Sequence, residues 1–144
     1  MILRIALPTP LRRLFDYQLP LTVANVPKAG CRVRVPFGNR ELIGLVVEIT
    51  DQSELPLAKL KPVHEILDTE PVLGPHLFEL TQWAARYYQY PEGDALCQSL
   101  PVLLRQGKPA AFAHALLWRA CSTASADQLS STAHRQRELL DLLI

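Results

Sequence analysis

Short apolar or alternating runs, most of them closed by proline, fill the first seventy residues of the chain. In residues 31–36 apolar side chains alternate strictly with Arg32 and Arg34, which puts the two arginines on one face of a strand and the apolar side chains on the other. Proline cannot donate a hydrogen bond to a sheet, so it marks where such a run ends. The pattern predicts strands at residues 2–7, 14–19, 31–36, 42–49 and 60–67.

Glycines between and within these runs indicate how the strands turn. Residues 28–30 are typical of a turn, and Gly38 lies in the short connection at residues 37–40, where it can take a positive φ or allow a close approach of backbone. Gly44, inside the fourth run, predicts a bulge or a sharp bend. Strands in such quick succession predict a small antiparallel barrel or curled sheet.

The pattern changes to helical spacing after Pro71. Apolar residues recur three and four positions apart, which predicts a helix from about residue 75 to residue 90 and a shorter helix over residues 93–100. The apolar positions at the first of these helices are Leu73, Leu77, Leu80, Ala84, Tyr87 and Tyr88. Together the two patterns predict an α+β fold with one or two helices beside the sheet.

Prolines and glycines after this helical region predict a domain boundary. We expect a first domain over residues 1–105, a linker over residues 106–110 and a second domain over residues 111–144. The second domain would hold a strand-like stretch at residues 111–120 and an amphipathic helix that begins near Thr132. This helix reaches Ile144 without a capping residue, so we expect the chain to be cut inside the second domain.

Composition and charge place the chain among folded proteins. Hydrophobic residues make up 49% and charged residues 20% of it. No apolar run is long enough to span a bilayer and residues 1–4 do not resemble a signal peptide, so we expect a cytoplasmic protein with no membrane partner. The net charge is only +1, but residues 1–50 hold seven cationic side chains against three carboxylates. This suits a surface that faces phosphates, although a solvated surface of mixed charge explains it equally well.

Nothing in the sequence indicates catalysis or metal binding. The phosphate-cradling GxxxxGK[ST] loop is absent, as are GxGxxG, HExxH and GxSxG, so we predict a chain with no enzyme activity and no cofactor of its own. Cys31, Cys97 and Cys121 are widely spaced and include no CxxC pair, which argues against a zinc site or a disulfide framework. We interpret all three as small buried side chains.

Several segments together carry a family resemblance. They are residues 6–11 and 15–20 (ALPTPL and FDYQLP), 29–38 (AGCRVRVPFG), 60–63 (LKPV), 85–88 (ARYY) and 100–107 (LPVLLRQG). In this order and spacing they resemble the N-terminal region of the PriA family, the primosomal replication-restart helicases also called primosomal protein N′. The resemblance covers residues 1 to about 109.

The resemblance implies an OB-like β-rich domain, followed from residue 111 by the start of a winged-helix domain. It implies that the domain binds the 3′-hydroxyl end of the nascent leading strand at stalled or branched forks, with little sequence specificity, in a nucleoid-associated protein. The family is an ATP-dependent 3′–5′ DNA helicase that loads the primosome, and the parts that use ATP, magnesium and zinc lie further along its chain. The family's pocket residues correspond to Phe15, Asp16, Gly38 and Lys61.

These residue types fit the chemistry of a strand end. A 3′-hydroxyl donates a hydrogen bond that the carboxylate of Asp16 would accept, whereas the same carboxylate would repel the phosphate of a continuous strand. Lys61 would hold the preceding phosphate as a point charge. Phe15 would pack beside the terminal base. Gly38 would let the protein backbone approach the terminal base or sugar without a Cβ in the way. Further candidate contacts to the DNA backbone are Arg32, Arg34 and Arg40.

Each candidate also has a structural interpretation. Phe15 and Phe37 would be core residues, Gly38 only a turn residue, and Lys61 an ordinary surface lysine. Asp16 would be an exposed ion-pair partner, although aspartate is disfavoured in strands.

Other features are open to the same choice. The two arginines of residues 31–36 would form a solvated strand face. We interpret Trp83 and the tyrosines Tyr87, Tyr88 and Tyr90 as core and helix packing rather than a stacking platform. For the whole chain, the alternative is a protein-interaction domain that docks single-strand-binding protein or other primosome members.

Overall fold

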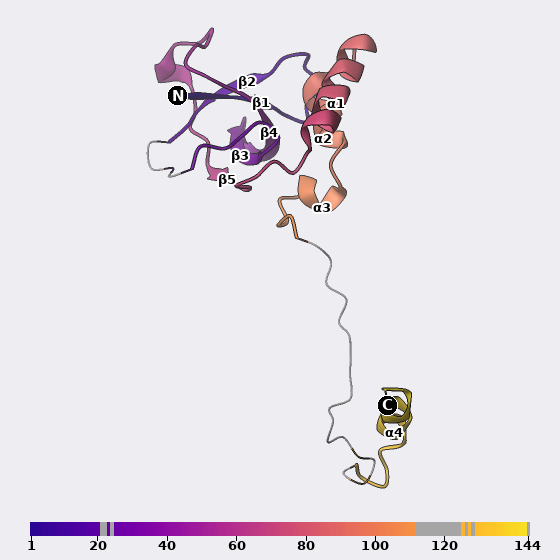
Figure 1. Cartoon of the computed structure of the whole chain (residues 1–144). Coiled ribbons are helices and arrows are strands. Elements are labelled where there is room, and N and C mark those ends of the chain that lie inside the picture. The colour runs from indigo at the N-terminus through magenta and orange to yellow at the C-terminus, as the bar shows by residue number, and fades with distance from the viewer. Residues whose placement is uncertain (21–22, 24, 112–124, 126, 128, 144) are drawn as a thin grey trace. The chain divides into compact units, whose positions relative to one another are not determined.

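The computed structural model describes residues 1–20, 23, 25–111, 125, 127 and 129–143. The chain divides into two compact units, Met1–Ala110 and Ala111–Ile144, each of which is described by itself (Figure 1). A strand-like stretch is predicted at residues 111–120. Only its first residue, Ala111, is among the described residues, so this prediction lies outside them.

A five-stranded antiparallel sheet dominates the first unit, as the alternating runs predict (Figure 1). Its strands are β1 (Ile2–Ala6), β2 (Phe15–Gln18), β3 (Arg32–Phe37), β4 (Arg40–Thr50) and β5 (Glu65–Ile66), in the order β2-β1-β4-β3-β5. Strand β5 is much shorter than the predicted residues 60–67. Pro62 has no N–H to donate, and a 3-10 turn, η1 (Leu57–Lys59), occupies the residues before it.

Residues 61–67 close the sheet on itself. At the β2 edge, the backbone of Gln18 donates to the carbonyl oxygen of Lys61 at 2.9 Å and accepts from the N–H of Val63 at 3.0 Å. The same segment then pairs with β3 through β5, and the N–H of Leu67 donates to the carbonyl oxygen of Arg32. Since β2 and β5 are the two ends of the strand order, the sheet curls until its edges meet, which is consistent with the expected OB-like fold.

Strand β4 bends where it lies against β1. The pairing between the strands shifts by one residue after Arg4, which leaves Val47 as the extra residue of a bulge. Three residues earlier, a Cβ on Gly44 would lie only 2.6 Å from the carbonyl oxygen of Ala6, so glycine is needed for the two strands to approach. The predicted bulge is therefore present in β4, but it lies at Val47, three residues after Gly44.

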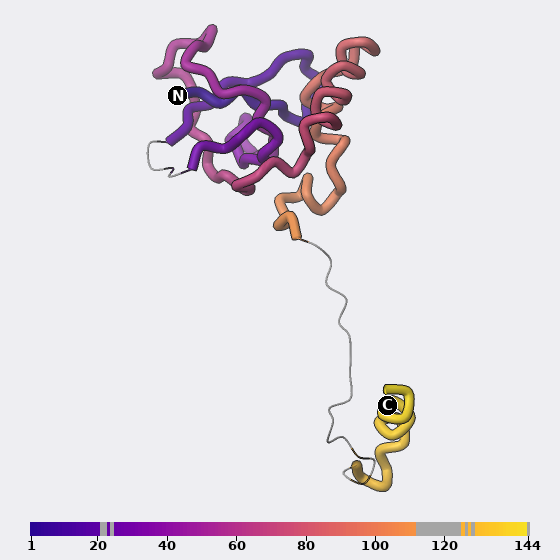
Figure 2. Tube along the Cα trace, in the orientation of Figure 1, coloured from indigo at the N-terminus to yellow at the C-terminus, as the bar shows by residue number. Residues whose placement is uncertain are grey.

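Three helices follow the sheet in the first unit, and Figure 2 traces the chain through them. They are α1 (Pro75–Tyr87), α2 (Glu92–Gln98) and α3 (Val102–Arg105). The first two confirm the predicted helices, whereas α3 is not among the predicted elements. Helix α1 starts with a proline, whose missing N–H costs nothing in the first turn.

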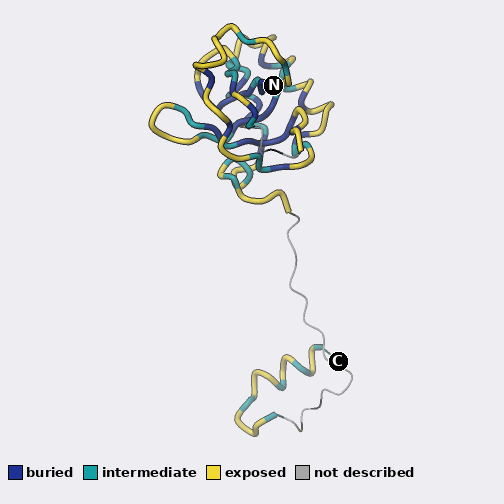
Figure 3. Tube along the Cα trace, turned by 90° about the vertical axis from the view of Figure 1, so that its left-hand side faces the viewer, coloured by how far each residue is buried: buried dark blue, intermediate teal, exposed yellow. Residues whose placement is uncertain are grey.

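Two apolar cores hold this unit together, and Figure 3 shows its buried positions gathered in the interior. The core inside the curled sheet consists of Leu3, Ile5, Leu7, Tyr17, Leu19, Val33, Val35, Val46 and Val63. The core between sheet and helices consists of Ala6, Leu45, Leu73, Phe78, Leu96 and Leu100.

Helix α1 buries a different face from the predicted one. Phe78 and Ala85 are its buried residues. The exposed residues of the predicted apolar face are Leu77, Leu80, Tyr87 and Tyr88. Trp83 is 57% and Tyr88 73% exposed, so the interpretation of this aromatic group as core is wrong. Its packing along the helix is confirmed, since Trp83 stacks on Tyr87 with ring centroids 5.2 Å apart and Tyr87 meets Tyr88 edge to face at 5.0 Å.

The solvated arginine face predicted for β3 is wrong at Arg32. The side chains of Arg32 and Asp68 are 1% and 6% exposed, and Nε and Nη2 of the arginine each donate to the carboxylate at 2.7 Å. Nη1 donates to the carbonyl oxygens of Leu104 and Lys108 at 2.7 and 2.9 Å. Helix α3 and the residues just after it therefore cover Arg32, and alternation alone cannot reveal such a cover.

In the second unit the structure describes one helix, α4 (His134–Leu143), close to the predicted start near Thr132. The described residues of α4 include no buried one. The expected winged-helix domain stays a prediction. Of the helices described in either unit, none is long and apolar enough to cross a membrane.

Candidate nucleic-acid-binding site

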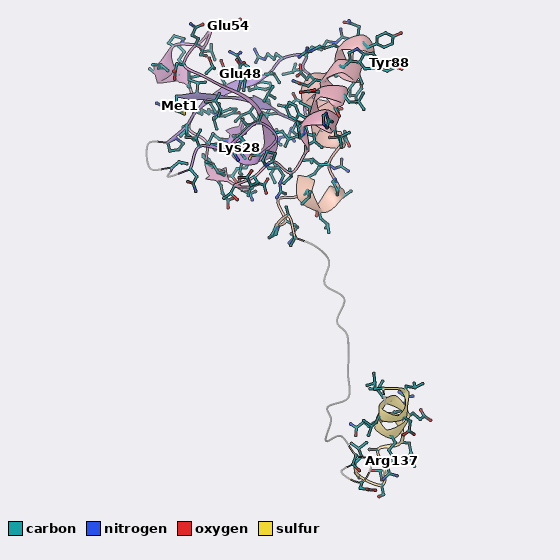
Figure 4. The ribbon with its side chains drawn as sticks, viewed as in Figure 1. Met1, Lys28, Glu48, Glu54, Tyr88 and Arg137 are labelled. Carbon is teal, nitrogen blue, oxygen red and sulfur yellow. The ribbon has the colours of Figure 1, made fainter. Side chains whose placement is uncertain are left out.

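A pocket of about 580 Å³ on the first unit brings together residues from three separate segments. Phe15 and Asp16 come from β2, Gly38 from the β3–β4 turn and Lys61 from the segment that closes the sheet. All four residues singled out by the family resemblance therefore line one cavity. The loop before η1 supplies a further wall, and Figure 4 shows its Glu54 at the edge of the unit.

Arg4 holds the carboxylate of Asp16 in place. The two residues pair across β1 and β2, and Nε of Arg4 donates to Oδ1 of Asp16 at 3.1 Å. Nη1 of Arg4 donates to Oε2 of Glu48 on β4 at 2.7 Å. The guanidinium on β1 thus bridges the carboxylates on the two neighbouring strands, β2 and β4. The hydrogen bond to Asp16, followed by the charges of both carboxylates, raises the pKa of Arg4 above its ordinary value. The ionised trio carries one net negative charge.

The side chain of Asp16 remains 14% exposed and lines the pocket. Its carboxylate is thus partly shielded from water and can still meet a ligand. Arg4 is not among the predicted site residues, because only the strand register shows it opposite Asp16. Its one signal in the sequence is a lone arginine within the apolar residues 2–7.

Phe15 and Phe37 form an aromatic wall of the pocket. Their rings meet edge to face with centroids 5.3 Å apart, and the guanidinium of Arg13 lies 4.9 Å from the centre of the Phe15 ring. Both phenylalanines are half-buried and pack against the sheet core, so they serve the core and the pocket together. The hydroxyl of Tyr17 donates to the carbonyl oxygen of Pro36 at 3.0 Å, which ties β2 to the end of β3.

Gly38 has a φ of +60° in the turn between β3 and β4. Phe37 and Arg40 are the last pair of this hairpin, so the turn contains two residues, and such turns need a positive φ at the first of them. A Cβ on Gly38 would meet nothing within 4 Å. The positive φ expected for this glycine is confirmed, and the close approach of a ligand to its backbone stays a prediction.

Lysines supply positive charge on the other side of the pocket. Lys59 ends η1 and Lys61 follows two residues later, and both side chains are exposed. The charged residues in the lining are Arg4, Arg13, Lys59 and Lys61 against Asp16 and Glu54. This excess of cations favours an anionic ligand. Lys59 and Arg13 are not among the predicted residues, since only the folded loop brings them to the pocket.

The arginines predicted as backbone contacts lie in three environments. Arg32 is buried against Asp68 and faces no ligand, so we leave it out of the interface. Arg34 is partly exposed, and its Nε donates to Oε2 of Glu65 at 2.9 Å. Arg40 is exposed beside the turn that holds Gly38. Arg34 and Arg40 remain predicted contacts.

No group of three or more His, Cys, Asp or Glu side chains among the described residues could hold a metal ion. Cys31 and Cys97 are buried, as predicted, and Cys121 lies outside the described residues. Burial raises the pKa of the Cys97 thiol to about 12.

A closed, curled sheet with an open cationic pocket is an arrangement typical of nucleic-acid-binding modules. Comparison with known proteins agrees with this class. The family model of the PriA 3′ DNA-binding domain (3′BD) matches residues 4–101. The chain belongs to this family, as its sequence motifs predict, and its first unit is a DNA-binding domain.

Curated relatives of the chain carry the name replication restart protein PriA. The one from Haemophilus influenzae is 42% identical over 118 residues, which are 82% of this chain and 16% of the relative. The one from Bacillus subtilis is 36% identical over 93 residues, 65% of this chain and 12% of the relative. The one from Synechocystis is 32% identical over 99 residues, 66% of this chain and 10% of the relative. The chain thus spans at most about a sixth of these relatives.

Proposed function

We propose that this domain captures the 3′-hydroxyl end of a DNA strand, namely the nascent leading strand at a stalled or branched replication fork. One observation carries the proposal: Phe15, Asp16, Gly38 and Lys61 come from three distant segments and line a single pocket. The name of the family supports a 3′ end as the ligand, and the names of the relatives support a role in replication restart.

Asp16 selects the end of the strand. Its carboxylate accepts a hydrogen bond from the terminal hydroxyl, a charge-assisted bond worth about 1.5–3 kcal/mol. A phosphate at the same place meets a trio with net negative charge, because Arg4 is already shared between Asp16 and Glu48. An internal nucleotide or a phosphorylated end is therefore disfavoured.

The rest of the pocket binds without reading sequence. Lys61 and Lys59 lie where they can neutralise the phosphate before the terminal nucleotide. Phe15 packs beside the base, and every base offers the same apolar face. Gly38 lets the sugar or base reach the backbone of the turn. Low sequence preference follows, as a protein that restarts forks at any position requires.

In the longer relatives we propose that an ATP-dependent helicase motor and a zinc-binding region lie outside the part matched here. This domain would then position the strand end for that motor. The chain itself contributes binding.

The test is a fluorescence anisotropy titration of the 144-residue chain with DNA that ends in a 3′-hydroxyl, in a 3′-phosphate, or in a recessed 5′ end. We expect the 3′-hydroxyl substrate to bind tightest. Asp16→Ala should weaken that complex about ten-fold or more and should tighten the 3′-phosphate complex, because the repelling charge is lost and Arg4 is released. The matched control is Glu70→Ala, which removes an exposed carboxylate that pairs with Lys28 and does not line the pocket, and it should leave both complexes unchanged. Equal losses on both ends would rule out the role of Asp16.

The second candidate function is a protein-interaction domain for single-strand-binding protein or other primosome members. Exposed apolar side chains on α3, Val102 and Leu103, favour it. Binding of a partner peptide in the absence of DNA, abolished by Leu103→Ser, would support it. The two functions can coexist, since α3 contributes no residue to the lining of the pocket.

A further inference from the structure

A row of hollows leads away from the pocket toward the end of α1. Arg13 lines both the pocket and a neighbouring hollow of about 220 Å³, which also takes in Arg12, Arg86 and Tyr90. Tyr90 in turn lines a third hollow of about 410 Å³ between α1 and α2, together with Tyr88. Shared lining residues place the three hollows next to one another on the surface. We call the two outer hollows the trough and define it by Arg12, Arg13, Arg86, Gln89, Tyr90 and Tyr88.

The near half of the trough is cationic. Arg12, Arg13 and Arg86 are exposed, and Nη1 of Arg12 donates to Oε1 of Gln89 at 3.4 Å. One carboxylate, Glu92, lies in the same hollow. It is committed to Gln82, which donates to it at 2.6 Å, and is 3.9 Å from Nη2 of Arg86. Three arginines thus face one carboxylate that already has partners.

The far half of the trough is aromatic. Figure 4 shows Tyr88 standing out from α1, and this residue is 73% exposed. Tyr90 is exposed as well, and its hydroxyl donates to Asp94, which fixes the ring at the junction of the two hollows. Gln89 between them has a φ of +54°, unusual for a residue with a side chain, and this conformation turns the chain so that both tyrosines reach the trough.

We propose that the trough is the path of single-stranded DNA whose 3′-terminal nucleotide occupies the pocket. Phosphates of the nucleotides on the 5′ side of the end lie on the arginines, and bases beyond them stack on Tyr88 and Tyr90. This inference rests on the proposed function, because the pocket sets where the strand ends.

Charge and continuity select DNA as the occupant. A strand held by its end must leave the pocket, and the hollow joined to the pocket by Arg13 is rich in arginine. A groove of cations that leads to exposed rings is the usual surface for single strands. An apolar protein partner would leave the arginines at the near end without anions, at a cost in desolvation.

The experiment measures how affinity grows with strand length. Oligothymidylates of three and of ten nucleotides, each with a 3′-hydroxyl or a 3′-phosphate, compete with a labelled strand for the full chain. Phosphate contacts and stacking in the trough should make the longer strand bind at least ten-fold tighter. The double variant Arg12→Ala/Arg86→Ala should lose this gain and bind the three-nucleotide strand as the wild type does.

Two controls separate the contributions. Lys28→Ala removes an exposed cation that pairs with Glu70 and lines neither the pocket nor the trough, and it should keep the gain. Tyr88→Leu should lose several-fold of the gain, whereas Tyr88→Phe keeps the stacking face and should retain it.

The outcomes distinguish the trough from the pocket. If the wild type prefers the 3′-hydroxyl but binds the ten-nucleotide strand no tighter than the three-nucleotide strand, the trough is not a path for DNA. A length gain that survives in the double variant would exclude that path as well and would leave this face to a protein contact. Loss of the hydroxyl preference, with a length gain that still depends on Arg12 and Arg86, would instead refute the pocket and leave the trough as a DNA path.

Discussion

The buried ion pair between Arg32 and Asp68 makes one sharp prediction about stability. Asp68→Ala removes the acceptor of three hydrogen bonds, from the backbone N–H of Arg32 at 3.0 Å and from its Nε and Nη2 at 2.7 Å each. The guanidinium would stay in an environment where its side chain is only 1% exposed. Losing one partner of a buried pair costs about 3–5 kcal/mol, because the remaining charge has no counterion.

A loss of this size is large for a domain of this kind. Each kcal/mol lowers the melting temperature by about 4 °C, so we expect a fall of roughly 12–20 °C. The cost arises from burial, and an exposed pair provides the comparison. Lys28 and Glu70 lie within 2.8 Å, yet their side chains are 63% and 71% exposed. Glu70→Ala should therefore change the stability far less than Asp68→Ala does.

Urea unfolding followed by circular dichroism measures both variants. A second variant tests the reasoning further: Arg32→Met/Asp68→Leu removes both charges and should recover part of the lost stability. Recovery should be incomplete, because Nη1 of Arg32 also holds the carbonyl oxygens of Leu104 and Lys108. Amide exchange at residues 104–108 should accordingly quicken. An Asp68→Ala variant no less stable than Glu70→Ala would refute the argument.

Three further predictions concern the pocket and the core. Gly38→Ala should cost about 1–2 kcal/mol of stability, because alanine is strained at this positive φ, and it should also weaken 3′-end binding. The control Gly74→Ala, at a φ of −62°, should change stability and binding little. Lys61→Ala should lower the slope of log affinity against log salt by about one, and an unchanged slope would mean that this lysine touches no phosphate. In the variant Cys121→Ser only Cys31 and Cys97 remain, and thiol reagents should label the folded chain very slowly at pH 8. The reason is that burial raises the pKa of Cys97 to about 12 and the pKa of Cys31 above its usual range. The thiols of the unfolded chain ionise near pH 8.5, so the free energy of unfolding should fall as the pH rises from there toward 12. Rapid labelling of the folded chain would contradict the burial of these cysteines.

The sequence predicted the sheet better than it predicted the surfaces that cover it. Short apolar or alternating runs located the first four strands, because both patterns are local properties of a strand. The fifth strand shrank to Glu65–Ile66, since Pro62 interrupts the ladder. Alternation could not show that Arg32 is covered, because Asp68 and Leu104 of α3 are distant from it in sequence.

Helix α1 shows the same limit. It has apolar residues on two faces, and the pattern alone cannot say which face meets the sheet. Phe78 and Ala85 are buried, and Trp83 is left exposed.

Motif resemblance located the candidate pocket but not all of its walls. It singled out Asp16 and Lys61, which do lie on one cavity. It did not indicate Arg4, whose place depends on the register of β1 between β2 and β4, or Lys59, whose place depends on the loop before it. Register and loop shape are set by tertiary packing, so single-sequence reasoning had no means to find them.

The central claim is that Asp16 distinguishes the end of a strand from its interior. The most direct measurement is the ratio of the dissociation constants for a 3′-phosphate end and a 3′-hydroxyl end, in the wild type and in Asp16→Asn at one salt concentration. The asparagine keeps an acceptor oxygen and loses the charge, and it frees Arg4 to attract a phosphate. The ratio should be about ten or more in the wild type and close to one in the variant. A ratio that stays the same in Asp16→Asn would contradict the account.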